Sequence, residues 1–169
     1  MKIRGSAIIL PADVNTDYII SSRRKRDQSQ PISLVPYLFE DLDPHVHELL
    51  KPGDVIVAGS GFGCGSAMEI AVATLVSARI GAIIAPSFAR TFYRNAVNLG
   101  LPLVETVSQG VDQGDILVVT YGTSPSVFNE TRRQYIETLP VSKFAVEVVS
   151  LGGLQNYLVC KGSLPRGLI

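Results

Sequence analysis

Short apolar runs, separated by glycine, proline and polar residues, recur along this chain of 169 residues. Lys2–Leu10 alternates in part between apolar and polar positions, which predicts a first strand. Val55–Ala58 and Ala82–Ala85 are continuous apolar runs, which are typical of strands buried on both faces. The pattern therefore predicts a sheet whose inner strands are covered on either side.

Two segments, one after each of the last two runs, have the apolar spacing of an amphipathic helix. They are Ser66–Ala78 and a segment from Ser87, as the cap, through Val97, after which Gly100 would end the helix in the left-handed conformation. Leu101–Glu105 is the next predicted strand. Strands that alternate with helices in this way predict a parallel sheet, so we expect an α/β fold in one domain with a mixed sheet.

The C-terminal third of the chain has less regular patterns. Asp115–Thr120 and Phe144–Val149 are predicted as strands, and Gly122–Thr131 as a hairpin or loop. Leu151–Cys160 is predicted as a last helix that starts near the two glycines at 152 and 153. We therefore expect more strand than helix in this part.

Ser21–Pro31 has no apolar residue, so we predict a mobile surface loop there. It carries four consecutive cations, Arg23, Arg24, Lys25 and Arg26. They are either a solvated group of charges or side chains that bind a carboxylate ligand in a bidentate manner.

The overall charge excludes some classes of partner. Fifteen Lys and Arg residues balance fifteen Asp and Glu residues, so no global field favours nucleic acid or an anionic membrane surface. Mean hydropathy is +0.27, yet no apolar run approaches the roughly 18 residues that a membrane span requires. Two cysteines cannot form a disulfide framework, which favours a reducing, cytoplasmic setting.

The segment Gly59–Glu69, G-S-G-F-G-C-G-S-A-M-E, leads from a predicted buried strand into a predicted helix. Backbone N–H groups converge at such a junction and can bind an anion. The glycine spacing fits neither the dinucleotide-binding pattern nor a P-loop, and the G-x-S-x-G elbow of serine hydrolases is absent. The segment therefore predicts anion binding without a nucleotide or a serine-hydrolase mechanism.

Ser66 has two interpretations at the expected helix start: it caps the helix, or it is a catalytic acid–base. Cys64 is either a reactive thiol or, as we favour, a small packing residue. The histidines and cysteines lack metal-ligand spacing, so no metal site is expected. Arg90 and Arg94 lie four residues apart on one helix face and are either solvated or in contact with a partner or ligand.

Three segments in order, Asp13–Ile20 (D-V-N-T-D-Y-I-I), Gly53–Ser66 and Ser87–Pro102, resemble the 3-isopropylmalate dehydratase small subunits. These belong to the aconitase superfamily, as do the small subunits of homoaconitase. The resemblance implies a single swivelling β/β/α domain over residues 1–169, with a mixed, mostly parallel sheet. It also implies an iron–sulfur large subunit as partner, with a [4Fe-4S] cluster there and no cofactor in this chain.

The resemblance further implies a reaction and a set of site residues. The reaction is the dehydration and rehydration of a small hydroxy-di- or tricarboxylic acid, in which Ser66 removes a proton α to a carboxylate while Gly65 and Ala67 contact substrate. The family motif S-S-R-E-H stands here as Ser66-Ala67-Met68-Glu69-Ile70, so its arginine is replaced by methionine. Altered catalysis, another substrate or a cation from elsewhere are the resulting alternatives.

A second departure lies in the substrate-specificity loop of the family. An aromatic–aliphatic pair is usual there, whereas this chain has Arg24, Lys25 and Arg26. We therefore predict that these three cations contact an anionic end of the substrate. Besides an isopropylmalate-type enzyme, a homoaconitase-like subunit and a non-catalytic paralogue that binds a partner stay open.

Overall fold

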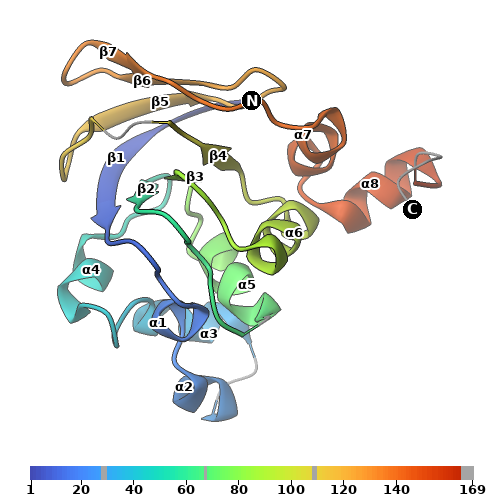
Figure 1. The fold of residues 1–169 in the computed structure, drawn as a ribbon. Coiled ribbons are helices and arrows are strands. Elements are labelled where there is room, and N and C mark those ends of the chain that lie inside the picture. Colours follow the sequence, from blue (N-terminus) through green and yellow to red (C-terminus); the bar gives the residue numbers. More distant parts are fainter. Residues whose placement is uncertain (28–29, 67, 108–109, 165–169) are drawn as a thin grey trace.

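The computed structural model describes residues 1–27, 30–66, 68–107 and 110–164 (Figure 1). The described strands form one sheet in the order β4-β3-β2-β1-β5-β6-β7. The strands are β1 (Lys2–Leu10), β2 (Val55–Ala58), β3 (Ala82–Ala85), β4 (Leu103–Glu105), β5 (Ile116–Thr120), β6 (Ser126–Asn129) and β7 (Gln134–Ile136). The helices are α1 (Thr16–Ile19), α2 (Ser22–Asp27), α3 (Pro31–Leu34), the 3-10 helix η1 (Val35–Tyr37), α4 (Pro44–Leu49), α5 (Glu69–Ser77), α6 (Arg90–Leu99), α7 (Lys143–Ser150) and α8 (Leu154–Lys161).

Strand direction changes at β1. This strand pairs in parallel with β2, which continues in parallel through β3 to β4, whereas β1 pairs antiparallel with β5, followed by β6 and β7. The α/β class and the mixed sheet are confirmed. The expected excess of parallel pairs is not found among these strands, because three pairings are of each kind. Short connections between β5, β6 and β7 permit only antiparallel hairpins there.

The two edges of the sheet meet. Thr106, which follows β4, forms an antiparallel bridge with Thr138, which follows β7. The N–H of Leu139 donates to the carbonyl of Glu105 at 2.8 Å. The curled sheet therefore closes on itself, and both edges gain partners for their backbone groups.

Two hydrophobic cores lie on the two faces of the parallel strands. Ile56 and Ile83 pack with the helices α1, α3, α5 and α6 on one face, whereas Val55 and Val57 pack with β5, β6 and β7 on the other. Alternate side chains of a strand point to opposite faces, so a strand between two cores has to be apolar throughout. The β/β/α arrangement follows from this layering (Figure 1).

The predicted strand at 144–149 is wrong, because this segment lies in helix α7. Ser142 caps the helix by accepting a hydrogen bond from the N–H of Ala145 at 3.2 Å. Ala145, Val148 and Val149 are buried with helical spacing. Its valines favour a strand locally, but packing of one face against the second core decides for the helix.

The predicted loop at 21–31 is also wrong in part, because α2 forms there. Arg23 pairs with Asp41 at 2.8 Å, and Arg24 pairs with Glu40 at 2.8 Å. The Arg24 guanidinium also lies 3.9 Å from the ring centre of Tyr37. These contacts with the following segment hold a helix that has no apolar face of its own.

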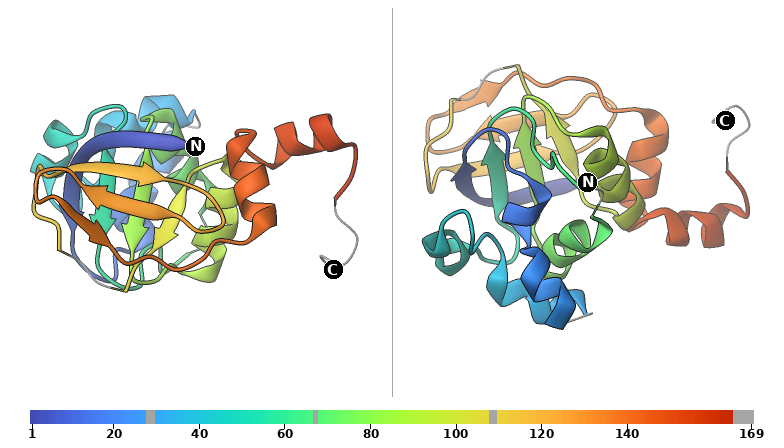
Figure 2. Two further views of the ribbon diagram at one scale, coloured as in Figure 1. Left: turned by 90° about the horizontal axis from the view of Figure 1, so that it is seen from above. Right: turned by 60° about the horizontal axis from the view of Figure 1, so that its bottom comes forward.

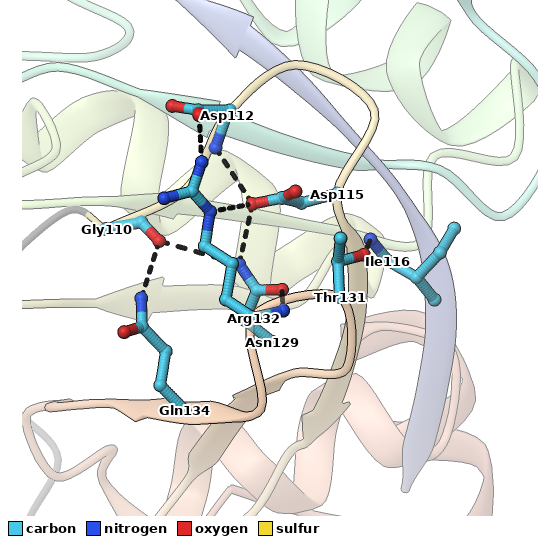
Figure 3. A network of polar contacts seen from close by, with 8 residues as sticks. All are labelled: Gly110, Asp112, Asp115, Ile116, Asn129, Thr131, Arg132 and Gln134. Carbon is cyan, nitrogen blue, oxygen red and sulfur yellow. Dashed lines mark hydrogen bonds and ion pairs between the residues drawn. The ribbon is translucent and has the colours of Figure 1, made fainter.

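A polar network, buried at Asp115 and Asn129 and exposed at Arg132 and Asp112, ties together the loops of the antiparallel half (Figure 3). Asp115 accepts from Arg132 Nε at 2.8 Å, from Asn129 Nδ2 at 2.7 Å and from the N–H of Asp112 at 3.0 Å. Arg132 also pairs with the Asp112 carboxylate. Each charge in the network has an opposite charge beside it, which is the arrangement that makes burial of polar groups tolerable.

Helix α8 extends away from the rest of the molecule (Figure 2). It begins after Gly153, which confirms the predicted start near the two glycines. It ends at Gly162, which has the left-handed conformation. Among the described residues, no helix combines the length and the apolar character needed to cross a membrane.

Candidate functional site

Two loops lie side by side at the carboxyl ends of the parallel strands. Residues 11–16 follow β1 and residues 59–66 follow β2. The N–H of Asp13 donates to the carbonyl of Ser60 at 2.7 Å, that of Gly63 to Val14 at 2.8 Å and that of Thr16 to Cys64 at 2.9 Å. This ladder of backbone hydrogen bonds fixes the glycine-rich loop that the sequence singled out.

Gly65 is required by the close approach of these loops. Its φ is +92°, and a Cβ atom there would lie 2.4 Å from Oδ1 of Asn15. That same oxygen caps α1 by accepting from the N–H of Asp17 at 2.9 Å. The D-x-N-T-D segment is therefore the partner against which the glycine loop is built, and only glycine fits at position 65.

Ser66 lies exposed at the end of the glycine loop. Its carbonyl accepts from Thr16 Oγ1 at 2.9 Å, which anchors the backbone, while its own hydroxyl has no hydrogen bond with any described residue. The predicted helix start at this position is wrong: α5 begins at Glu69, and its N-cap is Met68. The bond to Thr16 keeps Ser66 outside the helix, so it does not act as the cap.

The neighbour of Ser66 that was predicted to contact substrate, Ala67, lies outside the described residues. Gly65 and Ser66 are therefore the two predicted contacts of this loop whose placement is known. Neither is among the residues that line the cavities of about 640 and 290 Å³. This part of the site is an exposed, rigidly held edge.

The three cations predicted to contact substrate separate in the structure. Arg24 donates through Nε and Nη2 to both carboxylate oxygens of Glu40, at 2.8 and 2.9 Å. Lys25 instead turns toward the glycine loop, where its Nζ contacts Sδ of Met68 and lies 3.8 Å from Asp17 Oδ1. Arg26 is exposed. Only Lys25 is therefore brought next to the segment that carries Ser66.

Cys64 belongs to the ladder between the two loops. It forms a bridge with Asn15, and its Sγ donates to the carbonyl of Asp13 at 3.4 Å. These contacts support the interpretation as a packing residue. Within residues 1–27, 30–66, 68–107 and 110–164, no three His, Cys, Asp or Glu side chains gather as a metal site would require.

A cavity at the same edge of the sheet contains residues of which only two, Arg90 and Arg94, were singled out from the sequence. A cavity of about 640 Å³ opens at the start of α6, and its lining is Phe88, Arg90, Thr91, Tyr93, Arg94 and Glu105. We call it the α6 pocket. The two arginines were singled out by their spacing, but Glu105 comes from β4 and could not be assigned to them without the sheet order.

The start of α6 differs from the prediction, because its N-cap is Ala89 rather than Ser87. The Ser87 hydroxyl accepts instead from the N–H of Gly61 at 2.9 Å and so supports the glycine loop. Gly100 ends the helix with a φ of +79°, as expected.

Tyr93, which lines the α6 pocket, lies beside a second tyrosine. Burial, and next to it the charge of Glu105, raise the pKa of Tyr93 above its ordinary value. Burial and the proximity of Tyr93 raise the pKa of Tyr121 further. Both phenols therefore stay protonated throughout the physiological range.

Comparisons with known proteins agree with this geometry. Residues 45–108 match the family described as Aconitase C-terminal domain. The 3-isopropylmalate dehydratase small subunit of Aliarcobacter butzleri is 41% identical over 156 residues, 92% of this chain and 93% of that protein. The isopropylmalate/citramalate isomerase small subunit of Methanocaldococcus jannaschii is 39% identical over 92% of this chain and 93% of that protein.

Similarity to a solved structure extends over almost the whole fold. The crystal structure of a 3-isopropylmalate dehydratase from Methanocaldococcus jannaschii superposes with a TM-score of 0.89 at 35% sequence identity. The match covers 96% of this chain and 96% of that chain.

Proposed function

Because this chain belongs to the family of 3-isopropylmalate dehydratase small subunits, and is thus a subunit of a hydro-lyase, we propose that Ser66 is its catalytic residue. In this proposal the chain binds a large subunit, and the active site forms between the two. The observation that carries the assignment is the exposed Ser66 hydroxyl at the end of a rigid glycine loop. A group that serves a substrate held by a partner has to be exposed in the free chain and fixed in position.

Ser66 would act in proton transfer. Its Oγ, acting as the deprotonated alkoxide, takes the proton from the carbon α to a carboxylate and becomes the neutral hydroxyl. The hydroxyl group on the neighbouring carbon departs as hydroxide, which takes a proton from solvent to become water. On rehydration the proton and the hydroxyl add to the two carbons in exchanged positions, and the product is therefore an isomer of the starting acid. An iron–sulfur cluster, which we assign to the large subunit, supplies Lewis-acid polarisation of the departing hydroxyl when bound.

Lys25 supports a substrate with an additional negative charge. Its ammonium group lies against Met68, two residues beyond Ser66, and only 22% of its side chain is exposed. Its counter-charge within the chain, Asp17 Oδ1, approaches only to 3.8 Å. A substrate carboxylate would add a closer pair, whereas an apolar side group would displace solvent from the cation and supply no further partner. We therefore favour a hydroxy-di- or tricarboxylic acid, and the homoaconitase-like alternative gains support from the same contact.

A non-catalytic role is the competing proposal, since Met68 stands at the position where the S-S-R-E-H motif implied by the resemblance has its arginine. The contact between Lys25 and Met68 argues against it, because it supplies a cation to the same segment. We also place the assembled enzyme in the cytoplasm, and the free thiols of Cys64 and Cys160 support that location.

The experiment uses this chain assembled with its large subunit. Isopropylmalate, citramalate and a hydroxytricarboxylic acid are assayed for dehydration with the wild-type chain and with Ser66→Ala. We expect Ser66→Ala to lower kcat by about 10²–10⁴-fold, the range of general acid–base contributions, without loss of assembly. Ser60→Ala, an exposed serine of the same loop, is the matched control and should keep wild-type kcat. Equal activity of the two variants would exclude Ser66 as the proton-transferring group.

A further inference from the structure

The α6 pocket lies at the same edge of the sheet as Ser66. Glu105 ends β4, the glycine loop follows β2, and both strands run in parallel toward this edge. Phe62 of the glycine loop forms a parallel bridge with Phe88 of the pocket wall, and the N–H of Ala89 donates to the carbonyl of Phe62 at 2.9 Å. Any partner that covers the proposed catalytic edge therefore also meets this pocket.

Its two arginines form no ion pair among the residues that the structure describes. Neither Arg90 nor Arg94 forms an ion pair or hydrogen bond with any residue that the structure describes, and both are exposed. By contrast, Arg24 and Arg132 are each held by carboxylates of the same chain. Guanidinium groups bind carboxylates in a bidentate manner, so the α6 pocket offers two such places that the fold itself leaves open.

The spacing of these arginines fits a protein segment. Four residues along a helix correspond to a rise of roughly 6 Å. Two carboxylates on neighbouring turns of a helix, or two residues apart on an extended strand, lie at a comparable separation. An acidic segment of a protein can therefore pair with both arginines at once.

Glu105 argues against a small free diacid as the occupant. Its carboxylate forms part of the pocket lining, together with the half-buried ring of Tyr93. A small anion that entered the cavity would meet this negative charge, which opposes its binding. Acidic side chains that reach only the exposed arginines at the rim would avoid it, while the aromatic walls accept apolar neighbours.

We infer that the α6 pocket is the docking site for an acidic segment of the large subunit. This inference rests on the proposed function in one respect, namely that the chain works with a large subunit. Arg90 and Arg94 pair with carboxylates of that segment, and Phe88 and Tyr93 contact its apolar side chains. The glycine loop, which is bonded to the pocket wall, is thereby placed against the partner.

The first experiment measures the Kd between the cognate large subunit and this chain carrying Arg90→Glu with Arg94→Glu. We expect at least a thirtyfold weaker complex, because attraction becomes like-charge repulsion at two positions. Lys2→Glu with Lys161→Glu reverses the same number of exposed charges away from the pocket and should leave Kd within twofold. A double variant at 90 and 94 that binds within threefold of wild type would overturn the inference.

The second experiment keeps the charge and so does not depend on how the reversed variant folds. In the complex of the Arg90→Lys and Arg94→Lys variant, a carbodiimide couples lysine amines to carboxylates in direct contact. We expect amide crosslinks from positions 90 and 94 to Asp or Glu residues of the large subunit, identified by mass spectrometry. Their absence, in a complex that is otherwise intact, would contradict docking at this pocket.

A titration of the free wild-type chain with malate separates the two sources of carboxylate. We expect the wild-type chain and the Arg90→Glu, Arg94→Glu variant to show the same lack of malate binding. Malate binding that is present in the wild-type chain and lost in this variant would show a site for small acids and would overturn the docking inference. Failure of the proposed function is distinguishable. A Ser66→Ala complex with full activity would refute that function and leave the docking result unchanged, since docking is read from Kd.

Discussion

The two halves of the sheet use charged residues in opposite ways. In the antiparallel half, Arg132 pairs with both Asp112 and Asp115, and these ion pairs tie loops together (Figure 3). At the carboxyl edge of the parallel half, Arg90 and Arg94 have no partner among the described residues. The charges of the first cluster are paired by folding, whereas we propose that these two arginines of the second half pair with another molecule.

The comparison shows that the number of charges in a cluster is a poor guide to function. Arg24 belongs to the most basic segment of the chain, yet it is held by Glu40 and Tyr37. Lys25, its neighbour, reaches Met68 in the proposed site. What separates the two is how closely the fold holds each counter-charge: Glu40 binds Arg24 through two hydrogen bonds, whereas Asp17 Oδ1 approaches Lys25 only to 3.8 Å.

The largest effect on stability is expected at the centre of the satisfied network. Asp115→Ala removes the acceptor of three hydrogen bonds and leaves Asn129 buried without its carboxylate partner. We expect the free energy of unfolding to fall by about 3 kcal/mol, measured by urea denaturation. Arg4→Ala breaks the exposed pair with Glu130 and should cost under about 0.5 kcal/mol. Equal losses in the two variants would contradict the distinction between the halves.

Two glycine substitutions separate the effect of the close contact between Gly65 and Asn15 from the effect of a positive φ alone. Gly65→Ala introduces a Cβ atom 2.4 Å from Asn15 Oδ1 at a positive φ, and we expect a loss of about 2–3 kcal/mol. Gly114→Ala has a similar φ of +85° but nothing within 4 Å, so it should cost only about 1 kcal/mol. Thermal unfolding of both variants gives the difference. If Gly65→Ala is no more destabilising than Gly114→Ala, close approach has no energetic role.

A smaller effect is expected for the neighbouring cations Arg24, which pairs with Glu40, and Lys25, which lies against Met68 of the proposed site. Lys25→Met should raise KM for a hydroxytricarboxylic acid by about tenfold with little change in kcat, because one charge-assisted contact is lost. Arg24→Met should leave KM within twofold and lower stability instead, since it loses Glu40. Steady-state kinetics of the assembled enzyme give KM and kcat for both variants. An unchanged KM in Lys25→Met would remove Lys25 from the site.

The smallest effect concerns a polar group that the fold leaves unsatisfied. Tyr121 is 3% exposed, and its hydroxyl has no hydrogen-bond partner in the described part of the chain. Tyr121→Phe should therefore be neutral or stabilise by up to about 1 kcal/mol near pH 8.

The same variant has a signature in pH dependence. Burial, with a smaller contribution from Tyr93, raises the pKa of Tyr121, so the folded state holds this proton more tightly than the unfolded chain. The resulting stability is complete below about pH 10 and is lost as the pH rises above it. Denaturation midpoints at pH 8 and pH 10.5 should thus differ less in Tyr121→Phe than in wild type. An identical difference would show that this phenol does not titrate on unfolding.

Much of the parallel half was predictable because its signals are local. β1, β2 and β3 have the predicted bounds, since strands between two cores are apolar at every position. The end of α6 at Gly100 also follows from one residue's conformational preference. The glycine loop that carries Ser66 was predictable from the sequence, and its role as a site stays a prediction. The place of Ser66 outside α5 depends on the bond from Thr16, fifty residues away.

The amino-acid sequence by itself determined the α/β class, the inner strands and the loop that presents Ser66, because buried strands and glycine turns are encoded within a few residues. Only the tertiary structure decided that 143–150 is a helix, that Thr106 meets Thr138, and which cations stay without a partner. Those features depend on which distant surfaces pack together and on where each counter-charge falls. Neither is set by the residues nearby.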